Sequence, residues 1–510
     1  ILMNGFTLEG DTTEYTLRRG TTTIKGEGNT ITVNQGAGIK VTGEKTTLNL
    51  GANGYDKKLT IDGNAKGAFI TVSGGATANM YGNVTLQNRG FAGNACVVIK
   101  GLKSVTGPDS AFNMYGGVIE KCSRAVIVDS GATFHMLSGE IKDCWVNGDC
   151  VISVNDGSKF IMDGGTISGR KANAGSGLYA KNQSTITINN GTISGCEAGA
   201  GGGLYVDGSA VTISGGTISG CKAVNGYGGG LYAKNYSTVT IEGGTISGCT
   251  TSDAGMGGGL YAYNSTITIS GGTIENNKAT YGGGVALNNS WINSITNWKV
   301  IGNKAYKAKS SGNGGIGGGI YLDSVSMNVS AGSNRIYNNT ADIHGADICL
   351  EKGASITLPD AAGMGVKYRD SGINIDGWYN DKPPYTPSKD GEAVKERQLS
   401  GKWLLVASYK AIPVRIEIDA NGGEGGSVSQ TVHEGTTVTL EAPTREGHLF
   451  KGWKDEKGNS YPAGEDGKVK ITVTGAMTLT AVWKDRTFTV TYVLLDGKTR
   501  TETAAYGQNV

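Results

Sequence analysis

The sequence predicts an all-β protein, in which a right-handed parallel β-helix with three faces is followed by a small β-domain. Glycine is abundant and proline is scarce, with 85 Gly and 8 Pro in 510 residues, and no proline lies between Pro108 and Pro359. Strands that pair on both edges exclude proline, and glycine at this density disfavours helices. A short apolar block also recurs many times in one order. These observations favour a repetitive β-structure over a helical bundle, a collagen or a disordered chain.

The repeat unit contains three short stretches in which apolar and polar residues alternate, the pattern of strands buried on one face. The first row has pairs such as Leu178 and Ala180, the second has pairs such as Ile186 and Ile188, and the third has the Ile of a Gly-Thr-Ile-Ser-Gly segment. The third-row residues are Ile119, Ile141, Ile167, Ile193, Ile218, Ile246 and Ile274, which recur every 22 to 28 residues. Three strands in each coil of about 25 residues predict the three-faced solenoid, right-handed by the usual preference.

The corners of the coil differ in how much their length varies. In every regular coil the third-row residue lies five positions after the last residue of the second row, as Ile119 does after Met114. The corner between the third and first rows varies in length and is rich in glycine, as in residues 225–230 and 251–259. We therefore expect a fixed turn at the first of these corners and Gly-rich spacers at the second.

The repeats also divide the chain into segments. Residues 1–95 are rich in Thr and predict an N-terminal cap with degenerate coils, and residues 96–365 hold the regular coils. Residues 366–411 contain three closely spaced prolines and predict a connector and a C-terminal cap. In residues 412–485, alternating apolar residues with glycine turns predict a separate small β-domain whose core includes Phe450, Trp453 and Trp483.

Five cysteines occupy one position of the coil, three residues after the third-row apolar residue. They are Cys122, Cys144, Cys196, Cys221 and Cys249, where other coils carry Arg170, Asn277, Asn303 and Asn339. A position that accepts either Cys or Asn predicts an inward-facing stack. Neighbouring coils lie within disulfide distance, but parallel side chains fit the required dihedral angle poorly, so we favour a reduced, buried thiol stack over disulfides. The sequence has no Cys-x-x-Cys pair and no nearby His that would indicate zinc.

A tyrosine row alternates outward between the buried residues of the first row. Its members are Tyr179, Tyr205, Tyr232, Tyr261 and Tyr321. Stacking between neighbouring strands accounts for such a row by stabilising the face, and this is the favoured interpretation. The alternative is a platform for sugar rings. If ligands bind, the candidate residues are Tyr179, Tyr205, Tyr232, Tyr261, Lys181 and Lys234.

A polar row runs two residues beyond the tyrosine position. Its members are Lys100, Asp129, Asn155, Lys181, Asp207, Lys234 and Tyr263. Opposite charges on neighbouring strands are favourable without any catalytic role. The best catalytic alternative is Asp129, Asp156 and Asp207 with Lys181, as in a polysaccharide lyase or a glycoside hydrolase. The scarcity of acidic residues in the regular coils argues against this catalytic site. His135 lies at an outward position that Thr occupies in later coils, so we interpret it as a surface substitution.

Two parts of the chain resemble known families. The strings IEIDANGG, VHEGTTVTLEAPTREGHLFKGWK and MTLTAVW resemble the Listeria-Bacteroides repeat, which is similar to the B-repeats of internalins. This resemblance implies a compact β-grasp-like fold for residues 412–485 and the start of a truncated further repeat at 486–510. Upstream, GGTISGC, GGGLYA and GADICLEKGASITL resemble the pectin-lyase-like β-helix region of large surface proteins from Gram-positive gut bacteria, over about residues 1–365.

The pairing of these two resemblances implies a secreted protein that is attached to the cell wall through segments outside this chain. We expect a non-enzymatic adhesin or binding module whose partners are host or dietary glycans or a host surface protein. A net charge of +2 gives no basic stripe for nucleic acid, and no apolar run is long enough for membrane insertion. No motif indicates a metal or a cofactor. The alternatives are a polysaccharide lyase or glycoside hydrolase and a passive spacer.

Overall fold

The computed structural model divides into two compact units, Ile1–Gly365 with Gly377–Ser408, and Val366–Asp376 with Tyr409–Val510. The structure describes residues 7–8, 15–26, 28, 30–33, 38–63, 67–88, 95–102, 109–144, 150–169, 177–310, 312–328, 335–351, 353–357, 368–370, 373–380, 398–400, 403–411, 413–433, 437–464, 466–473, 475–494 and 496–508. The expected ladder residue Arg170 and the prolines Pro383, Pro384 and Pro387 lie outside these ranges.

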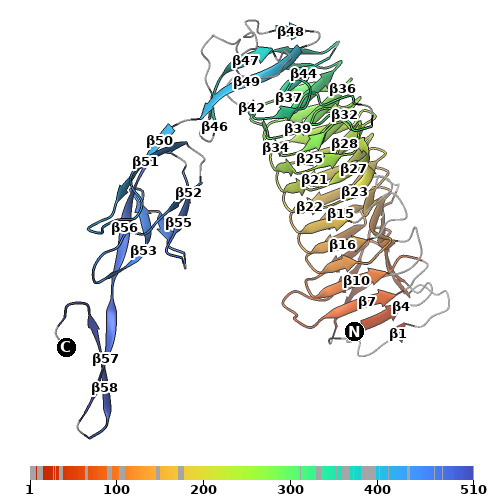
Figure 1. Ribbon diagram of the computed structural model, residues 1–510. Helices are drawn as coiled ribbons and strands as arrows, with labels where there is room; N and C mark the ends of the chain where they lie inside the picture. The colour runs from red at the N-terminus through yellow and green to blue at the C-terminus, as the bar shows by residue number, and fades with distance from the viewer. Residues whose placement is uncertain are drawn as a thin grey trace. The chain divides into compact units, whose positions relative to one another are not determined.

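The first unit is a parallel β-solenoid, as the repeat predicts (Figure 1). Its first sheet contains β2 (Tyr15–Leu17), β5 (Ile39–Thr42), β8 (Ile70–Ser73), β11 (Ala95–Lys100), β14 (Arg124–Asp129), β17 (Ile152–Val154), β20 (Leu178–Lys181), β24 (Leu204–Asp207), β28 (Leu231–Lys234), β32 (Leu260–Tyr263), β36 (Val285–Asn288), β40 (Ile320–Asp323) and β44 (Ile348–Leu350). Its second sheet contains β3 (Gly20–Ile24), β6 (Thr46–Leu50), β9 (Thr77–Met80), β12 (Ala111–Met114), β15 (Thr133–Met136), β18 (Lys159–Met162), β21 (Thr185–Ile188), β25 (Ala210–Ile213), β29 (Thr238–Ile241), β33 (Thr266–Ile269) and β37 (Trp291–Ile295).

The third sheet contains β1 (Thr7–Leu8), β4 (Thr30–Val33), β7 (Leu59–Gly63), β10 (Val84–Asn88), β13 (Val118–Glu120), β16 (Glu140–Cys144), β19 (Thr166–Gly169), β22 (Thr192–Ser194), β26 (Thr217–Ser219), β30 (Thr245–Ser247), β34 (Thr273–Glu275), β38 (Lys299–Ile301) and β42 (Arg335–Tyr337). The three sheets hold the three rows of the sequence. Strands from the Thr-rich segment before residue 95 join the same sheets in the same order as the regular coils.

The solenoid interior consists of like residues stacked from coil to coil. The rings of Phe112, Phe134 and Phe160 in the second sheet lie 5.5 and 5.2 Å apart, and in later coils Ile186 and Val211 continue the stack. All five side chains are buried. Burial of about 25 cal/mol per Å² of apolar surface makes this continuous core the main source of stability, since no single coil can bury its own apolar face.

The corner between the second and third sheets is a fixed turn, as its constant length predicts. Each regular coil has a glycine two residues before the third-row residue, and Gly244, for example, has φ +77°. A Cβ atom on Gly244 would lie 2.7 Å from the carbonyl oxygen of Gly215 in the preceding coil. The turn therefore requires both a left-handed backbone and the absence of a side chain.

The corner between the third and first sheets contains a short fourth sheet that the three-row pattern did not predict. Its strands are β23 (Glu197–Ala200), β27 (Lys222–Tyr227), β31 (Thr250–Thr251), β35 (Lys278–Ala279), β39 (Lys304–Ala305) and β43 (Thr340–Ala341). The Gly triplets after these strands lie in close contact with the backbone of the next coil, so the prediction that they are spacers was wrong. Gly228 has φ +61°, and Cβ atoms on Gly229 and Gly230 would lie 2.4 and 2.6 Å from carbonyl oxygens of the next coil.

Antiparallel strands follow the last parallel coil. β49 (Trp403–Ala411) pairs with β44, and β48 (Gln398–Ser400) pairs with β45 (Ser355–Thr357), which itself pairs with β41 (Ser326–Asn328). In the first sheet, β49 is followed by β47 (Ile373–Asn380) and β46 (Tyr368–Asp370). Covering the open edge of the final coil in this way prevents it from pairing with other chains.

The second unit contains a small mixed β-sheet domain. A five-stranded sheet has the order β51 (Gln430–His433), β50 (Pro413–Asp419), β56 (Met477–Asp485), β53 (His448–Asp455) and β54 (Ser460–Pro462), and β52 (Thr437–Leu440) pairs with β55 (Val469–Thr472). β50 and β56 are parallel. Of the three aromatic residues expected in the core, Trp453 is fully buried, whereas Phe450 and Trp483 are partly buried and pack against it.

After this domain, β57 (Thr487–Val493) and β58 (Thr499–Ala505) form a two-stranded hairpin. Several of its apolar side chains are exposed, including Phe488, Val493 and Leu494. Within the described ranges the chain has no helix, and hence none long and apolar enough to cross a membrane.

Candidate functional site

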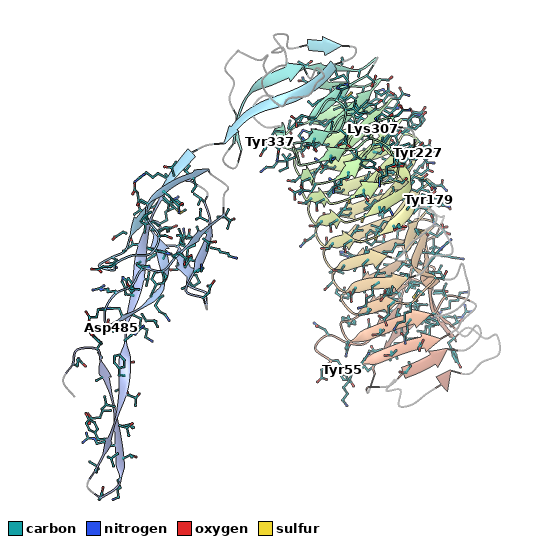
Figure 2. The ribbon with its side chains drawn as sticks, in the orientation of Figure 1. Tyr55, Tyr179, Tyr227, Lys307, Tyr337 and Asp485 are labelled. Carbon is teal, nitrogen blue, oxygen red and sulfur yellow. A yellow bond between two sulfur atoms is a disulfide. The ribbon has the colours of Figure 1, made fainter. Side chains whose placement is uncertain are left out.

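The tyrosine row lies on the outer face of the first sheet, where equivalent residues of successive coils are in register. The rings of Tyr179 and Tyr205 are 4.9 Å apart, those of Tyr205 and Tyr232 are 5.1 Å apart, and those of Tyr232 and Tyr261 are 5.2 Å apart. Figure 2 labels Tyr179, the first residue of this row, on the solenoid. All three pairs are stacked with ring planes within 11° of one another. The period-2 alternation of the strands therefore places four aromatic rings in one continuous column.

The tyrosines point outward from the sheet as predicted, but a second layer of side chains covers one end of this column. Tyr261 and Tyr321 are only 5% and 7% exposed. The covering residues come from the Gly-rich corner, where backbone bridges join Tyr227 to Met256 and Met256 to Tyr281. The ring of Tyr227 lies 5.8 Å from that of Tyr232 and 5.5 Å from that of Tyr261. Only the end formed by Tyr179, Tyr205 and Tyr232 remains partly open to solvent.

The covering layer has a sequence signal. An apolar residue directly precedes most of the Gly triplets, and it recurs four positions before the first buried residue of the following strand. These residues are Ala200, Tyr227, Met256, Tyr281 and Ile316. The left-handed first glycine of each triplet reverses the chain, which brings the preceding side chain over the outward residue of the next strand.

Two lysines border the open end of the column. Lys181 Nζ lies 5.9 Å from the centre of the Tyr179 ring, and Lys234 Nζ lies 5.3 Å from that of Tyr205. Lys234 also pairs with Asp207 at 3.3 Å, whereas no carboxylate of the described residues lies within ion-pair distance of Lys181. Burial opposes the charged form of Lys234, but hydrogen bonding and attraction from Tyr205 and Asp207 raise its pKa overall. The open end therefore presents the edges and hydroxyls of stacked tyrosine rings next to positive charge.

Tyr179 and Tyr232 are held neutral by burial. Burial raises the pKa of Tyr179 to about 12, and burial together with the neighbouring Tyr205 raises the pKa of Tyr232 to about 12. The phenol hydroxyls therefore remain hydrogen-bond donors over the whole range of pH in which proteins ordinarily work.

The residues of the catalytic alternative lie in four successive coils, and the structure gives each a separate environment. Asp129 lies beside Lys100 on the neighbouring strand, and Asp156 accepts a hydrogen bond from Asn182 at 2.7 Å. Asp207 pairs with Lys234 and also accepts a hydrogen bond from Asn235, while Lys181 lies over Tyr179. Among the described residues, each of Asp156 and Asp207 is engaged by a neighbouring Asn or Lys side chain, and no hydrogen bond joins two of these carboxylates.

The cysteine position faces inward as expected, but one of its residues is oxidised. Cys122 forms a disulfide with Cys96 in β11, with the Cα atoms 6.3 Å apart, so the predicted reduced state is wrong for Cys122. Cys144, Cys196, Cys221 and Cys249 are buried thiols that form no disulfide. Burial raises the pKa of Cys144 to about 12, which makes it a poor nucleophile. Cys96 lies outside the ladder, and only the folded coil brings it beside Cys122.

Asparagine continues the cysteine ladder as a chain of buried hydrogen bonds. The side chain of Asn303 accepts hydrogen bonds from the main chain and side chain of Asn277, both at 3.0 Å, and Asn339 accepts the corresponding bonds from Asn303. Asp347 ends the series by accepting both bonds from Asn339. Cys249 N donates to Asn277 at the other end of the series, so the two residue types share one ladder with a structural role.

His135 lies on the outer face of the second sheet, as predicted for a surface substitution. Its Nε2 atom lies 2.6 Å from Asp163 Oδ2. Asn189 also donates to Asp163 at 2.7 Å, and these two contacts lower the pKa of Asp163, with Asn189 contributing more. The pair is largely exposed and contacts none of the candidate residues.

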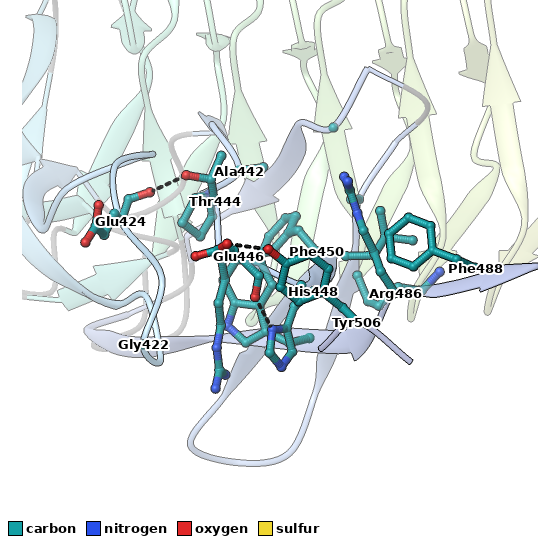
Figure 3. A pocket seen from close by; sticks show the side chains of 18 of the residues that line it. Gly422, Glu424, Ala442, Thr444, Glu446, His448, Phe450, Arg486, Phe488 and Tyr506 are labelled. Atoms are coloured by element: carbon teal, nitrogen blue, oxygen red, sulfur yellow. Dashed lines mark hydrogen bonds between the residues drawn. The ribbon is translucent and has the colours of Figure 1, made fainter. Parts of the chain in front are cut away.

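A cavity of about 1170 Å³ lies between the small domain and the hairpin of the second unit (Figure 3). Its wall includes Phe450, Trp483 and Phe488, and the Tyr506 hydroxyl donates to Glu446 across it. One wall is therefore a two-stranded hairpin, which is marginally stable in isolation. The cavity is a junction between the domain and the hairpin, and no motif in the sequence predicted it.

Comparison with known families identifies both parts of the chain. Residues 124–249 and 202–375 match the family model of the right handed beta helix region, and residues 416–487 match that of the divergent InlB B-repeat domain. Both kinds of domain are typical of surface proteins. These matches confirm the right-handed β-helix and the repeat module that the sequence predicted.

A relative from Evansella cellulosilytica, which carries the provisional name of a Gly-rich membrane protein, is 29% identical over 162 residues. The match covers 31% of this chain and 17% of the relative, so the chain spans a small part of that protein. No solved structure shows a significant match to the chain.

Proposed function

We propose that this chain, which joins a right-handed β-helix region to a divergent InlB B-repeat domain, is a non-enzymatic cell-surface protein that binds glycans on the open end of its tyrosine column. The two domain types support display outside the cell, with the β-helix carried on repeat modules that lead to the cell wall. In this proposal the ligands are host or dietary glycans that carry acidic groups.

The observation that carries the proposal is the environment of Tyr205. Its ring is partly exposed between Tyr179 and Tyr232, and a lysine ammonium lies beside it. Because the rings stack on one another, their edges and phenol hydroxyls face the ligand, and these hydroxyls can exchange hydrogen bonds with sugar hydroxyls. A carboxylate on the same sugar would reach Lys181, which has no ion-pair partner among the described residues. The column of rings about 5 Å apart also suits an extended chain of sugars better than a single one.

An array of sialylated glycans and oligogalacturonides tests this proposal when it is probed with the full chain and two variants. Wild type should bind acidic glycans, and Tyr232→Ala should lose that signal because it breaks the column. Tyr321→Phe is the matched control, because Tyr321 is the same residue type in the same row but is buried. An array without acidic ligands, or equal binding by wild type and Tyr232→Ala, would refute the proposal.

The same screen addresses the catalytic alternative. If the protein only binds, incubation with the bound polysaccharide releases no shorter products, and Asp207→Asn leaves product formation at the background level. Release of unsaturated or reducing ends that depends on Asp207 would instead establish a lyase or a hydrolase.

A further inference from the structure

A second group of aromatic residues protrudes where the coil turns from the first sheet to the second. Tyr236 is 77% exposed, Trp291 is 51% exposed and Tyr263 is 38% exposed. The rings of Tyr236 and Trp291 lie 6.1 Å apart with their planes 19° from parallel. We call these three residues the corner platform. Aromatic side chains of this exposure bury little surface within the protein, so folding alone does not explain them.

Tyr236 occupies an extra position in its turn. Thr238 and Thr266 are in register on neighbouring strands, but the turn before Thr238 is one residue longer than the turn that follows Tyr263. The extra residue has φ +62°, a left-handed conformation that is strained for tyrosine. Gln183 has φ +63° in the longer turn of another coil, which means that the turn itself does not require an aromatic side chain.

Side-chain amides border the corner platform. Asn289 Nδ2 donates to Asn264 Oδ1 at 2.6 Å, and Asn264 O accepts a hydrogen bond from Tyr236 N at 2.6 Å. These contacts leave an N–H donor on Asn264 and the carbonyl oxygen of Asn289 without a partner among the described residues. Asn289 lies two residues before Trp291, so open donor and acceptor groups lie next to the aromatic rings.

We infer that the corner platform, together with Asn264 and Asn289, is a binding site for neutral glycans built of gluco-configured pyranose rings. Such rings have apolar C–H faces that pack on aromatic side chains and equatorial hydroxyls that exchange hydrogen bonds with amides. The open polar groups of the platform are uncharged, unlike the lysines beside the tyrosine column. This inference does not rest on the proposed function, because the residues and the ligand class both differ.

Calorimetric titration of the full chain with cellohexaose tests the inference. Trp291→Ala should weaken binding by about tenfold or more, as expected for loss of a central aromatic contact. Tyr236→Gly should weaken binding to a similar extent and leave the thermal midpoint unchanged, because glycine adopts the left-handed conformation without strain. This second variant separates loss of the ligand contact from loss of folding.

Tyr115→Ala is the matched control for an exposed, stacked aromatic residue. Tyr115 is 45% exposed and stacks on Tyr81 with ring centres 5.2 Å apart, and its variant should retain wild-type affinity for cellohexaose. Tyr205→Ala should also retain it, which distinguishes this site from the tyrosine column. The inference is overturned if wild type fails to bind cellohexaose, if both platform variants bind it as wild type does, or if Tyr205→Ala abolishes binding.

Discussion

At the scale of single residues, the tyrosine column combines stacking with partial burial. Burial suppresses ionisation of Tyr179 and Tyr232, whose pKa values rise from the ordinary 10.0 to about 12. The neutral form is thus favoured in the folded state. This contribution to stability is fully present below pH 10 and is lost as the pH rises towards 12.

Spectrophotometric titration of the tyrosine side chains should therefore show a late component, from Tyr179 and Tyr232, that ionises near pH 12. In Tyr179→Phe the late component should shrink. Titration of all tyrosines near the ordinary value without unfolding would contradict the burial of the column.

A second residue-scale prediction concerns the asparagine ladder. Asn303→Ala should lower the free energy of unfolding by about 3 kcal/mol, because it leaves the buried main-chain N–H of Asn277 without its acceptor and removes the side-chain donor to Asn339 and to the carbonyl oxygen of Ile274. Denaturant titration measures the change. Asn303→Cys should cost less, since Cys249 occupies the equivalent position of an earlier coil. Equal losses in the two variants would contradict the interchangeability of Cys and Asn in this ladder.

At the scale of elements, the turn between the second and third sheets depends on its glycine. Gly244→Ala should destabilise the protein by about 2 kcal/mol or more, because alanine is strained at positive φ and its methyl group would collide with the preceding coil. Gly82→Ala is the control, because a Cβ atom there would meet nothing within 4 Å. Thermal unfolding of the two variants checks the difference, and a Gly244→Ala protein as stable as Gly82→Ala would contradict it.

The disulfide gives a second element-scale prediction. Closing a loop between Cys96 and Cys122, which are separated by 26 residues, contributes about 3 kcal/mol by loop-entropy arguments. A reductant should therefore lower the thermal midpoint of wild type and leave that of Cys96→Ser unchanged. Equal sensitivity of both proteins to the reductant would indicate that this bond does not stabilise the solenoid.

The alternating rows were predictable because the side-chain period of a strand is fixed by its backbone. Ile193 and Leu204 could be placed in the core from their spacing alone, as could the outward position of Tyr205. The fourth sheet depends on how closely two backbones approach at the Gly triplets. That distance is a property of several coils together, so no single stretch of sequence encodes it. The burial of Tyr261 was missed, although the apolar residues that precede the Gly triplets are a sequence signal for it.

At the scale of the whole chain, both domain types were recognisable because their motifs are local. The repeat module is recognised from the sequence strings around Trp453, and the β-helix is recognised from a block of residues that recurs in every coil. The pairing of Cys96 with Cys122 was not predictable, since it joins a ladder position to one outside the ladder. The corner platform was also missed as a unit, because the row pattern gives no indication that Tyr236 and Trp291 meet across a corner.

Tyr205 and its neighbours form the proposed glycan-binding face of the β-helix. Isothermal titration calorimetry of wild type and Tyr205→Ala with an acidic oligosaccharide identified on the array tests it most directly. We expect Tyr205→Ala to weaken binding by about tenfold or more at a temperature at which both proteins are folded. Equal affinity of the two proteins for that ligand would contradict a glycan-binding role for this face.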